Sequence, residues 1–175
     1  MTFSEFIQKY DGKQVEVAGS SGALYQCVDL ANAYIRDVLL LPIIEWTNAK
    51  DFPSKANGLY DFPSTPQNGD LVVWNGNVGL GAGHIGVFIE GTTSGFKSFD
   101  QNWRWNQTCH IENHTYQNVS TYMRKKGVSM HDPVRNTYFQ WISHLIGDGR
   151  PYEQNDQEYE KRLLEIVNKI LTNRG

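Results

Sequence analysis

The spacing of hydrophobic side chains predicts two helices in the first quarter of the chain. After Cys27, apolar residues recur with a period near 3.6, which is typical of an amphipathic helix with one buried stripe. This stripe consists of Leu30, Ala31, Tyr34, Ile35 and Val38. We expect the helix to end near Leu41-Pro42, because proline disfavours helical geometry in the residue before it. A similar stripe predicts a short helix over Ser4–Tyr10.

Farther along, short apolar runs separated by glycine-rich connections predict an antiparallel sheet. The runs cover 69–74, 84–90, 96–103 and 115–123. If the turn between the second and third runs is symmetric about Thr93, His84 lies opposite Asn102. Because side chains alternate between the faces of a strand, Asp100 then points to that same face and Gln101 to the other.

The pattern is irregular over Trp46–Gln67, which we interpret as a long loop. It carries Trp46, Phe52, Tyr60 and Phe62. Long loops are often functional, so these rings form either a groove wall or the edge of a core. Trp103 and Trp105 have the same two interpretations, and Trp74 could join them in a core. The segment 104–113 is polar and aromatic, and no element is predicted there.

Two later amphipathic patterns predict helices over 136–146 and 156–171. They follow the predicted sheet and are separated by a linker that contains glycine and proline. We therefore expect a helical C-terminal extension over 128–175.

Composition places the chain among globular proteins. It has 175 residues, of which 39% are hydrophobic and 13% aromatic, enough for one domain with a sizeable core. A net charge of −3 gives no basic face, so no nucleic acid partner is expected. The N-terminus lacks a signal-peptide pattern, and no stretch approaches the ~20 apolar residues of a membrane span. We expect synthesis in a cytoplasm without a signal peptide, and no membrane insertion.

Cys27 is the first candidate for chemistry. It follows the polar segment 19–22 and lies near the predicted helix N-terminus, where free N–H groups and the helix dipole favour a thiolate. The same N–H groups can bind a developing oxyanion. The alternative is a small buried core residue. A disulfide with Cys109, the second of two cysteines, would consume this nucleophile.

A histidine and two polar residues complete a candidate catalytic set. His84 begins one predicted strand, and Asp100 and Asn102 lie on the next. A thiol amidohydrolase needs a thiolate to attack the amide, an imidazole to carry the proton and a third group to orient the ring. These residue types therefore indicate amide hydrolysis.

Short motifs around these residues resemble the CHAP family, the cysteine- and histidine-dependent amidohydrolases/peptidases. The motifs are Gln26–Leu30, Gly69–Trp74, Gly83–Val87 and Asp100–Trp103, in that order, and Asn118–Arg124 is similar to the closing strand of the family. The resemblance implies a papain-like α+β fold, with N-terminal helices, one of them bearing the cysteine, packed on an antiparallel sheet. It also implies a catalytic domain over 1–127.

The resemblance further implies a function and site roles. Cys27 would be the nucleophile and His84 the general base, with Asp100 and Asn102 as polar partners of the ring. Such enzymes cleave peptidoglycan as N-acetylmuramoyl-L-alanine amidases or as endopeptidases of the stem or cross-bridge. Many are bacteriophage lysins, which reach the cell wall through holin-type release or as virion components. The last predicted helix would offer a surface for self-association or a larger phage assembly.

No cofactor is expected. Some phage members carry a calcium loop of acidic residues before the cysteine, but here 17–24 holds no carboxylate, and Asp29 alone cannot supply the 6–8 oxygen ligands that calcium takes. Cys109, His110 and His114 could form a zinc site only with a fourth ligand. The alternative for the two histidines is an ordinary pair at a strand edge.

Two other functions remain open from the sequence. One is a non-catalytic phage structural or wall-binding protein on a papain-like scaffold. The other is a papain-like amidase with a non-wall substrate. Reaction of Cys27 with iodoacetamide well below pH 8.5 would favour a catalytic role.

Overall fold

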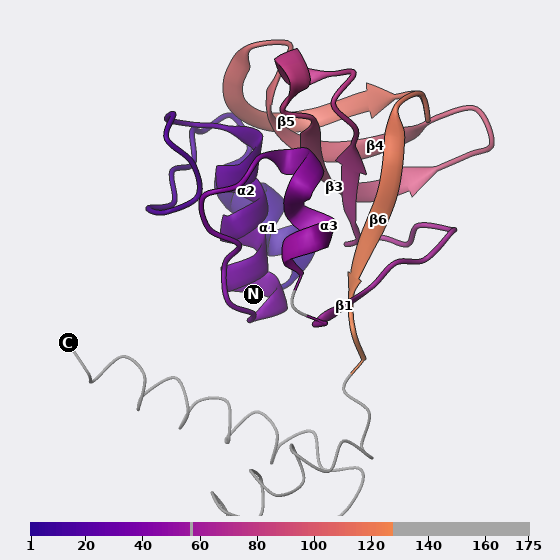
Figure 1. The fold of residues 1–175 in the computed structure, drawn as a ribbon, viewed down its shortest axis with the longest axis horizontal. Helices are drawn as coiled ribbons and strands as arrows, with labels where there is room; N and C mark the ends of the chain where they lie inside the picture. Colours follow the sequence, from indigo (N-terminus) through magenta and orange to yellow (C-terminus); the bar gives the residue numbers. More distant parts are fainter. Residues whose placement is uncertain (57, 128–175) are drawn as a thin grey trace, which may run out of the picture. The chain divides into compact units, whose positions relative to one another are not determined.

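A computed structural model describes residues 1–56 and 58–127 (Figure 1). The chain divides into two compact units, and Met1–Lys126 is the first of them. The predicted helices over 136–146 and 156–171, and with them the predicted C-terminal extension, lie outside the described residues.

Helical elements come first along the chain and long strands follow. The helical elements are α1 (Phe3–Tyr10), α2 (Cys27–Tyr34), η1 (Ile35–Leu39), η2 (Ala49–Asp51), α3 (Phe52–Lys55) and η3 (Gly79–Gly81). The strands are β1 (Tyr60–Asp61), β2 (Leu71–Trp74), β3 (His84–Gly91), β4 (Phe96–Trp103), β5 (Asn106–His114) and β6 (Val119–Lys125). This is the predicted α+β class. Within the described part of the chain, no helix has the length and hydropathy needed to cross a bilayer.

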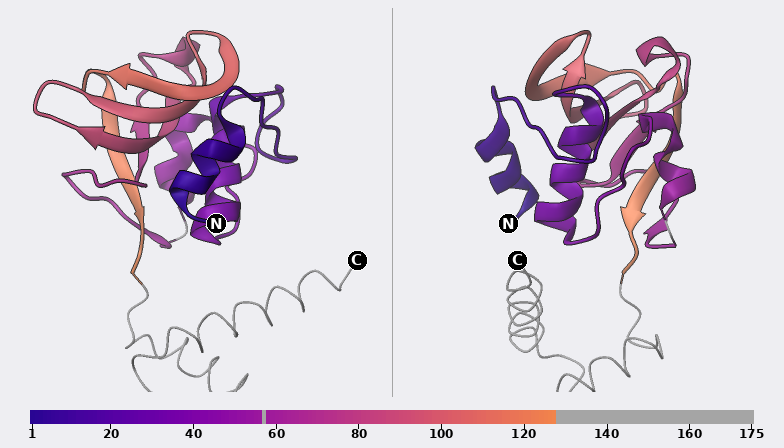
Figure 2. Two further views of the ribbon diagram at one scale, coloured as in Figure 1. Left: turned by 180° about the vertical axis from the view of Figure 1, so that it is seen from behind. Right: turned by 60° about the vertical axis from the view of Figure 1, so that its left-hand side comes forward.

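The strands form one antiparallel sheet in the order β1-β6-β2-β3-β4-β5 within the described residues. The helices α1 and α2 lie together on one side of this sheet (Figures 1 and 2). Strand β6 returns to pair with β2, so the end of the described chain lies beside the strand that precedes β3. Helix α2 packs against β3 and β4, and Gln26, the residue before its first turn, is hydrogen-bonded to β4.

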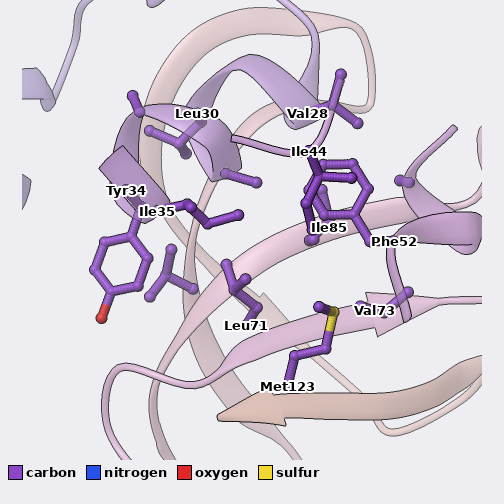
Figure 3. Packing of buried hydrophobic residues seen from close by; sticks show 14 of the residues in the cluster. Val28, Leu30, Tyr34, Ile35, Ile44, Phe52, Leu71, Val73, Ile85 and Met123 are labelled. Carbon is purple, nitrogen blue, oxygen red and sulfur yellow. The ribbon is translucent and has the colours of Figure 1, made fainter. Parts of the chain in front are cut away.

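Alternation along the strands gives the sheet two buried faces. On the helix side, side chains of α2 pack against Leu71, Val73 and Ile85 (Figure 3). On the other side, Trp74 and Phe96 belong to a second cluster. Each large apolar side chain that is fully buried stabilises the fold by about 1.5–3 kcal/mol.

The predicted register between β3 and β4 holds in the middle of the pair but is wrong near the turn, and the predicted pairing of His84 with Asn102 lies beyond the paired residues. Val87 pairs with Phe99 and Phe88 with Ser98, as a turn symmetric about Thr93 requires. A bulge after Phe88 shifts the pairing by one residue toward the turn. The extra residue of a β-bulge changes which residues pair beyond it, and sequence alternation alone does not reveal it.

The cysteine helix is shorter than predicted as a regular α-helix. It ends at Tyr34 and continues as the π-helical turn η1, after which Leu40 has a left-handed φ of 54°. The N–H of Leu41 donates to the carbonyl of Ile35 at 3.1 Å, so this hydrogen bond spans more residues than the one that repeats along an α-helix. This widened turn therefore ends the helix before the proline does.

Two segments hold structure that the sequence pattern did not predict. The interval 46–67 contains η2, α3 and β1, and its Phe52 and Tyr60 are buried in the core while Trp46 and Phe62 are exposed. The polar segment after Trp103 forms β5. It is an edge strand of the sheet, which explains its polar composition.

Candidate active site

Cys27 is the first residue of α2 and is half-buried. The turn before it is fixed by the buried Asp29, whose carboxylate accepts from the backbone N–H of Gln26 at 2.7 Å and of Val17 at 3.3 Å. Burial raises the pKa of Asp29, and these hydrogen bonds act against that rise. Asp29 therefore anchors the loop that delivers the cysteine.

His84 begins β3 and lies opposite Trp74 of β2. Its Nε2 is 2.8 Å from Oδ1 of Asp100. Because an ionised carboxylate can only accept, Nε2 carries the hydrogen, and Nδ1 is the ring nitrogen left for another partner. Cys27 lies close enough to this ring to raise its pKa, and both side chains line the same cavity. The structure thus bonds His84 to Asp100 and places Cys27 beside the same ring.

Charges around His84 favour its protonated form. Burial by itself lowers the pKa of the imidazole, but the charge of Cys27 and the hydrogen bond to Asp100 outweigh it and raise that pKa to about 10. The ring lies between two acidic groups, so an imidazolium is stabilised from both sides.

Asp100 is fully buried on β4 and accepts three hydrogen bonds. Its Oδ1 accepts from His84, and its Oδ2 accepts from Ser98 Oγ at 2.7 Å and from His114 Nε2 at 3.0 Å. Burial alone would raise the pKa of Asp100, but the bonds from the two histidines hold it well below its usual range. Gly86 lies directly against this carboxylate, and a Cβ there would collide with Oδ1.

Asn102 is hydrogen-bonded to Gln26 and not to the histidine ring. Its Nδ2 donates to Oε1 of Gln26 at 2.9 Å. Gln101 points to the opposite face, as predicted, where its amide bonds to both backbone groups of Val15 and to the carbonyl of Gln26. Two consecutive residues of β4 therefore hold the residue immediately before Cys27.

His114 is a part of this cluster that the sequence analysis missed. We considered it as a strand-edge histidine or a zinc ligand, but it is buried and bonded to Asp100. Cys109 bonds instead to Gln101, and His110 bonds to Glu112. Had the polar segment been recognised as β5, alternation would have placed His114 on the face of Asp100. Within residues 1–56 and 58–127, no group of three His, Cys, Asp or Glu side chains is arranged to hold a metal.

Two tryptophans surround both histidines. The ring centroid of Trp103 lies 4.8 Å from that of His84 and 4.6 Å from that of His114, and the corresponding distances for Trp74 are 5.2 and 4.8 Å. Trp74 is buried, as one of its two interpretations required. These rings keep water away from the hydrogen bonds to Asp100, which strengthens them.

An open cavity of about 530 Å³ gives access to Cys27 and His84. Its walls come from four parts of the chain, 21–28, 47–49, 78–84 and 102–105. Trp105, with an exposed fraction of 68%, lines it, as the groove interpretation required. The arrangement can bring an extended substrate to the thiol, with the backbone N–H groups at the start of α2 nearby.

Comparisons with known proteins agree with this architecture. The family model "CHAP domain" matches residues 17–102. The chain is 31% identical over 115 residues to endolysin PlyTW of Staphylococcus phage Twort. This alignment covers 57% of the present chain and 25% of that protein. It therefore spans about a quarter of the length of this curated relative.

Solved structures share the fold. Endolysin LysIME-EF1 superposes with a TM-score of 0.53 at 20% identity, covering 71% of this chain and 63% of that one. Ly7917 gives a TM-score of 0.55 at 18% identity, covering 71% and 62%. The motifs, the fold and the family model agree: residues 17–102 of this chain match the CHAP domain family.

Proposed function

We propose that this protein is a peptidoglycan hydrolase that cleaves an amide bond with Cys27 as nucleophile. The observation that carries the proposal is the position of His84, which is bonded to Asp100 and lines one open cavity together with Cys27. The match of residues 17–102 to the CHAP domain family and the similarity to a phage endolysin support a wall substrate. The proposed place of action is the bacterial cell wall.

The chemistry follows from the protonation of the cluster. The raised pKa of His84 favours a thiolate–imidazolium pair with Cys27. The thiolate adds to the amide carbonyl, and the oxyanion accepts from backbone N–H groups at the start of α2. The imidazolium then gives its proton to the leaving amine as the C–N bond breaks, which leaves a thioester. His84 next deprotonates a water that attacks this thioester, and the carboxylic acid product and free thiol are released.

Asp100 would fix the tautomer of the ring and stabilise its positive charge, since it accepts from Nε2. Asn102 would act differently, because it binds the side chain of Gln26 and so positions the start of α2. The bond cleaved is either N-acetylmuramoyl-L-alanine or a peptide bond of the stem or cross-bridge.

Fragment analysis tests this proposal. Purified Gram-positive walls are incubated with wild type or Cys27→Ala, and soluble products are identified by mass spectrometry. An amidase would release intact stem peptides with a free N-terminal alanine, and an endopeptidase would release shortened stems or opened cross-bridges. Fragments released equally by both proteins would exclude a thiol mechanism. Wall binding without any release would favour the non-catalytic alternative.

A further inference from the structure

His114 is the last residue of β5 and pairs with Phe96 of β4. Its side chain is buried, and the ring of Phe96 stacks on it with centroids 5.3 Å apart. The hydrogen bond from Nε2 to Oδ2 of Asp100, at 3.0 Å, joins it to the proposed catalytic residues. Burying a second histidine is costly unless its ring is hydrogen-bonded, and the bond to Asp100 meets that requirement.

The bonding of Asp100 shows what His114 does to it. Oδ2 is occupied by Ser98 and His114, so the carboxylate cannot rotate to present that oxygen to His84. Oδ1 is the oxygen left for His84. The plane of the carboxylate, and with it the orientation of the His84 ring, is thus set from the far side of Asp100.

His114 does not line the cavity that holds Cys27. It lines an adjoining hollow of about 420 Å³, together with Asn113, Gln117 and Asn118. Its hydrogen bond to Asp100 is its direct polar link to the proposed catalytic residues, and the rings of Trp74 and Trp103, which contact both histidines, are an apolar one. The Asp100→Asn background described below separates these two routes.

We propose that His114 is a positioning residue, which holds Asp100 in the orientation that fixes the His84 ring against Cys27. This inference rests on the proposed function and extends the set Cys27, His84 and Asp100 by one residue.

The experiment compares three variants in the full-length chain. His114→Phe keeps a ring among the aromatic neighbours and removes the donor, whereas His114→Gln keeps an N–H donor of similar reach. His110→Phe is the matched control, because His110 lies on the same strand but bonds to Glu112. Thermal unfolding and circular dichroism establish that each variant is folded.

Two readouts are used. We expect kcat for wall cleavage to fall about 10-fold in His114→Phe with little change in KM, to recover largely in His114→Gln, and to stay unchanged in His110→Phe. The rate of Cys27 alkylation by iodoacetamide should follow the same order. In an Asp100→Asn background, His114→Phe should cause no further loss, because a residue that acts only through Asp100 is not additive with it.

The outcomes separate this inference from the proposed function. Normal kcat and normal alkylation in a folded His114→Phe would overturn the positioning role while leaving the hydrolase proposal intact. An equal loss in His114→Gln, or an additional loss in the Asp100→Asn background, would also overturn it. If wild type cleaves no wall, the hydrolase proposal fails, and the alkylation rates alone still decide whether His114 acts on the thiol site.

Discussion

Asn102 Nδ2 donates to Gln26 Oε1 at 2.9 Å, so a residue on β4 holds the residue before the cysteine. Asn102 has a left-handed φ of 59°, a conformation that asparagine tolerates better than most residues. The bond connects the sheet that carries His84 and Asp100 to the helix that carries Cys27. The distance between nucleophile and base therefore depends on it.

Removing this contact should weaken the reaction without abolishing it. We expect Asn102→Ala to lower kcat/KM on the order of 10-fold, because small displacements of reacting groups are costly. Asp100→Asn should lower it by roughly 10²-fold or more, since it alters the partner of the base. A double-mutant cycle of Asn102→Ala with Gln26→Ala, measured on solubilised wall, checks the coupling. Fully additive losses would show that this hydrogen bond does not transmit the effect.

The raised pKa of His84 predicts how stability depends on pH. Below about 6.5 the imidazole is protonated in the folded and unfolded states, and between 6.5 and about 10 it is protonated mainly in the folded state. The stabilisation is therefore complete below about 6.5 and is lost as pH rises toward about 10.

Thermal unfolding from pH 6 to pH 10 measures this effect. We expect the melting temperature of wild type to fall more steeply than that of His84→Gln. The comparison removes the contribution of groups that titrate in both proteins. Parallel curves would mean that the folded protein does not hold the His84 proton more tightly.

Gly86→Ala tests the space that Asp100 needs. A Cβ at this position would collide with the carboxylate that accepts from His84. We expect a loss of about 1–3 kcal/mol in the free energy of unfolding, together with a strong loss of activity. Gly127→Ala is the control, because a Cβ there meets nothing within 4 Å. Urea denaturation and wall clearing, measured side by side, check both effects, and an active, fully stable Gly86→Ala would contradict the geometry.

The two cysteines should differ in reactivity. Burial raises the pKa of Cys109 to about 12, and its thiol donates to Gln101 at 3.0 Å. We therefore expect iodoacetamide at pH 7 to label Cys27 and to leave Cys109 unmodified in the folded protein. Peptide mapping after labelling checks this, and urea-unfolded protein, in which both react, is the control. Labelling of Cys109 in the native state would show that it is not sealed from solvent.

The sequence predicts the elements that carry Cys27, His84 and Asp100 better than it predicts the segments around them. Leu30 to Val38 and the runs in β2, β3 and β4 follow simple periods, so their elements and the shared face of His84 and Asp100 can be predicted. Local alternation is sufficient there, because each of these strands is buried in the sheet.

The rest depends on contacts that local pattern does not contain. Strand β5 is polar because it lies at an edge, so its His114 could not be placed beside Asp100. The sequence does not decide between Asp100 and Asn102 as partner of the ring. The left-handed backbone at Asn102, which accompanies a side chain bonded to Gln26, is not visible in the residue pattern. The π-helical turn after Tyr34 likewise has no signature in the hydrophobic period.

The most direct test of the account is the clearing of purified Gram-positive cell walls, followed by turbidity. Wild type, Cys27→Ala and Asp100→Asn are compared at equal concentration, after their folding has been verified by circular dichroism. We expect rapid clearing by wild type, none by Cys27→Ala and slow clearing by Asp100→Asn. Equal clearing by wild type and Cys27→Ala would contradict this expectation, because the cysteine would then be structural.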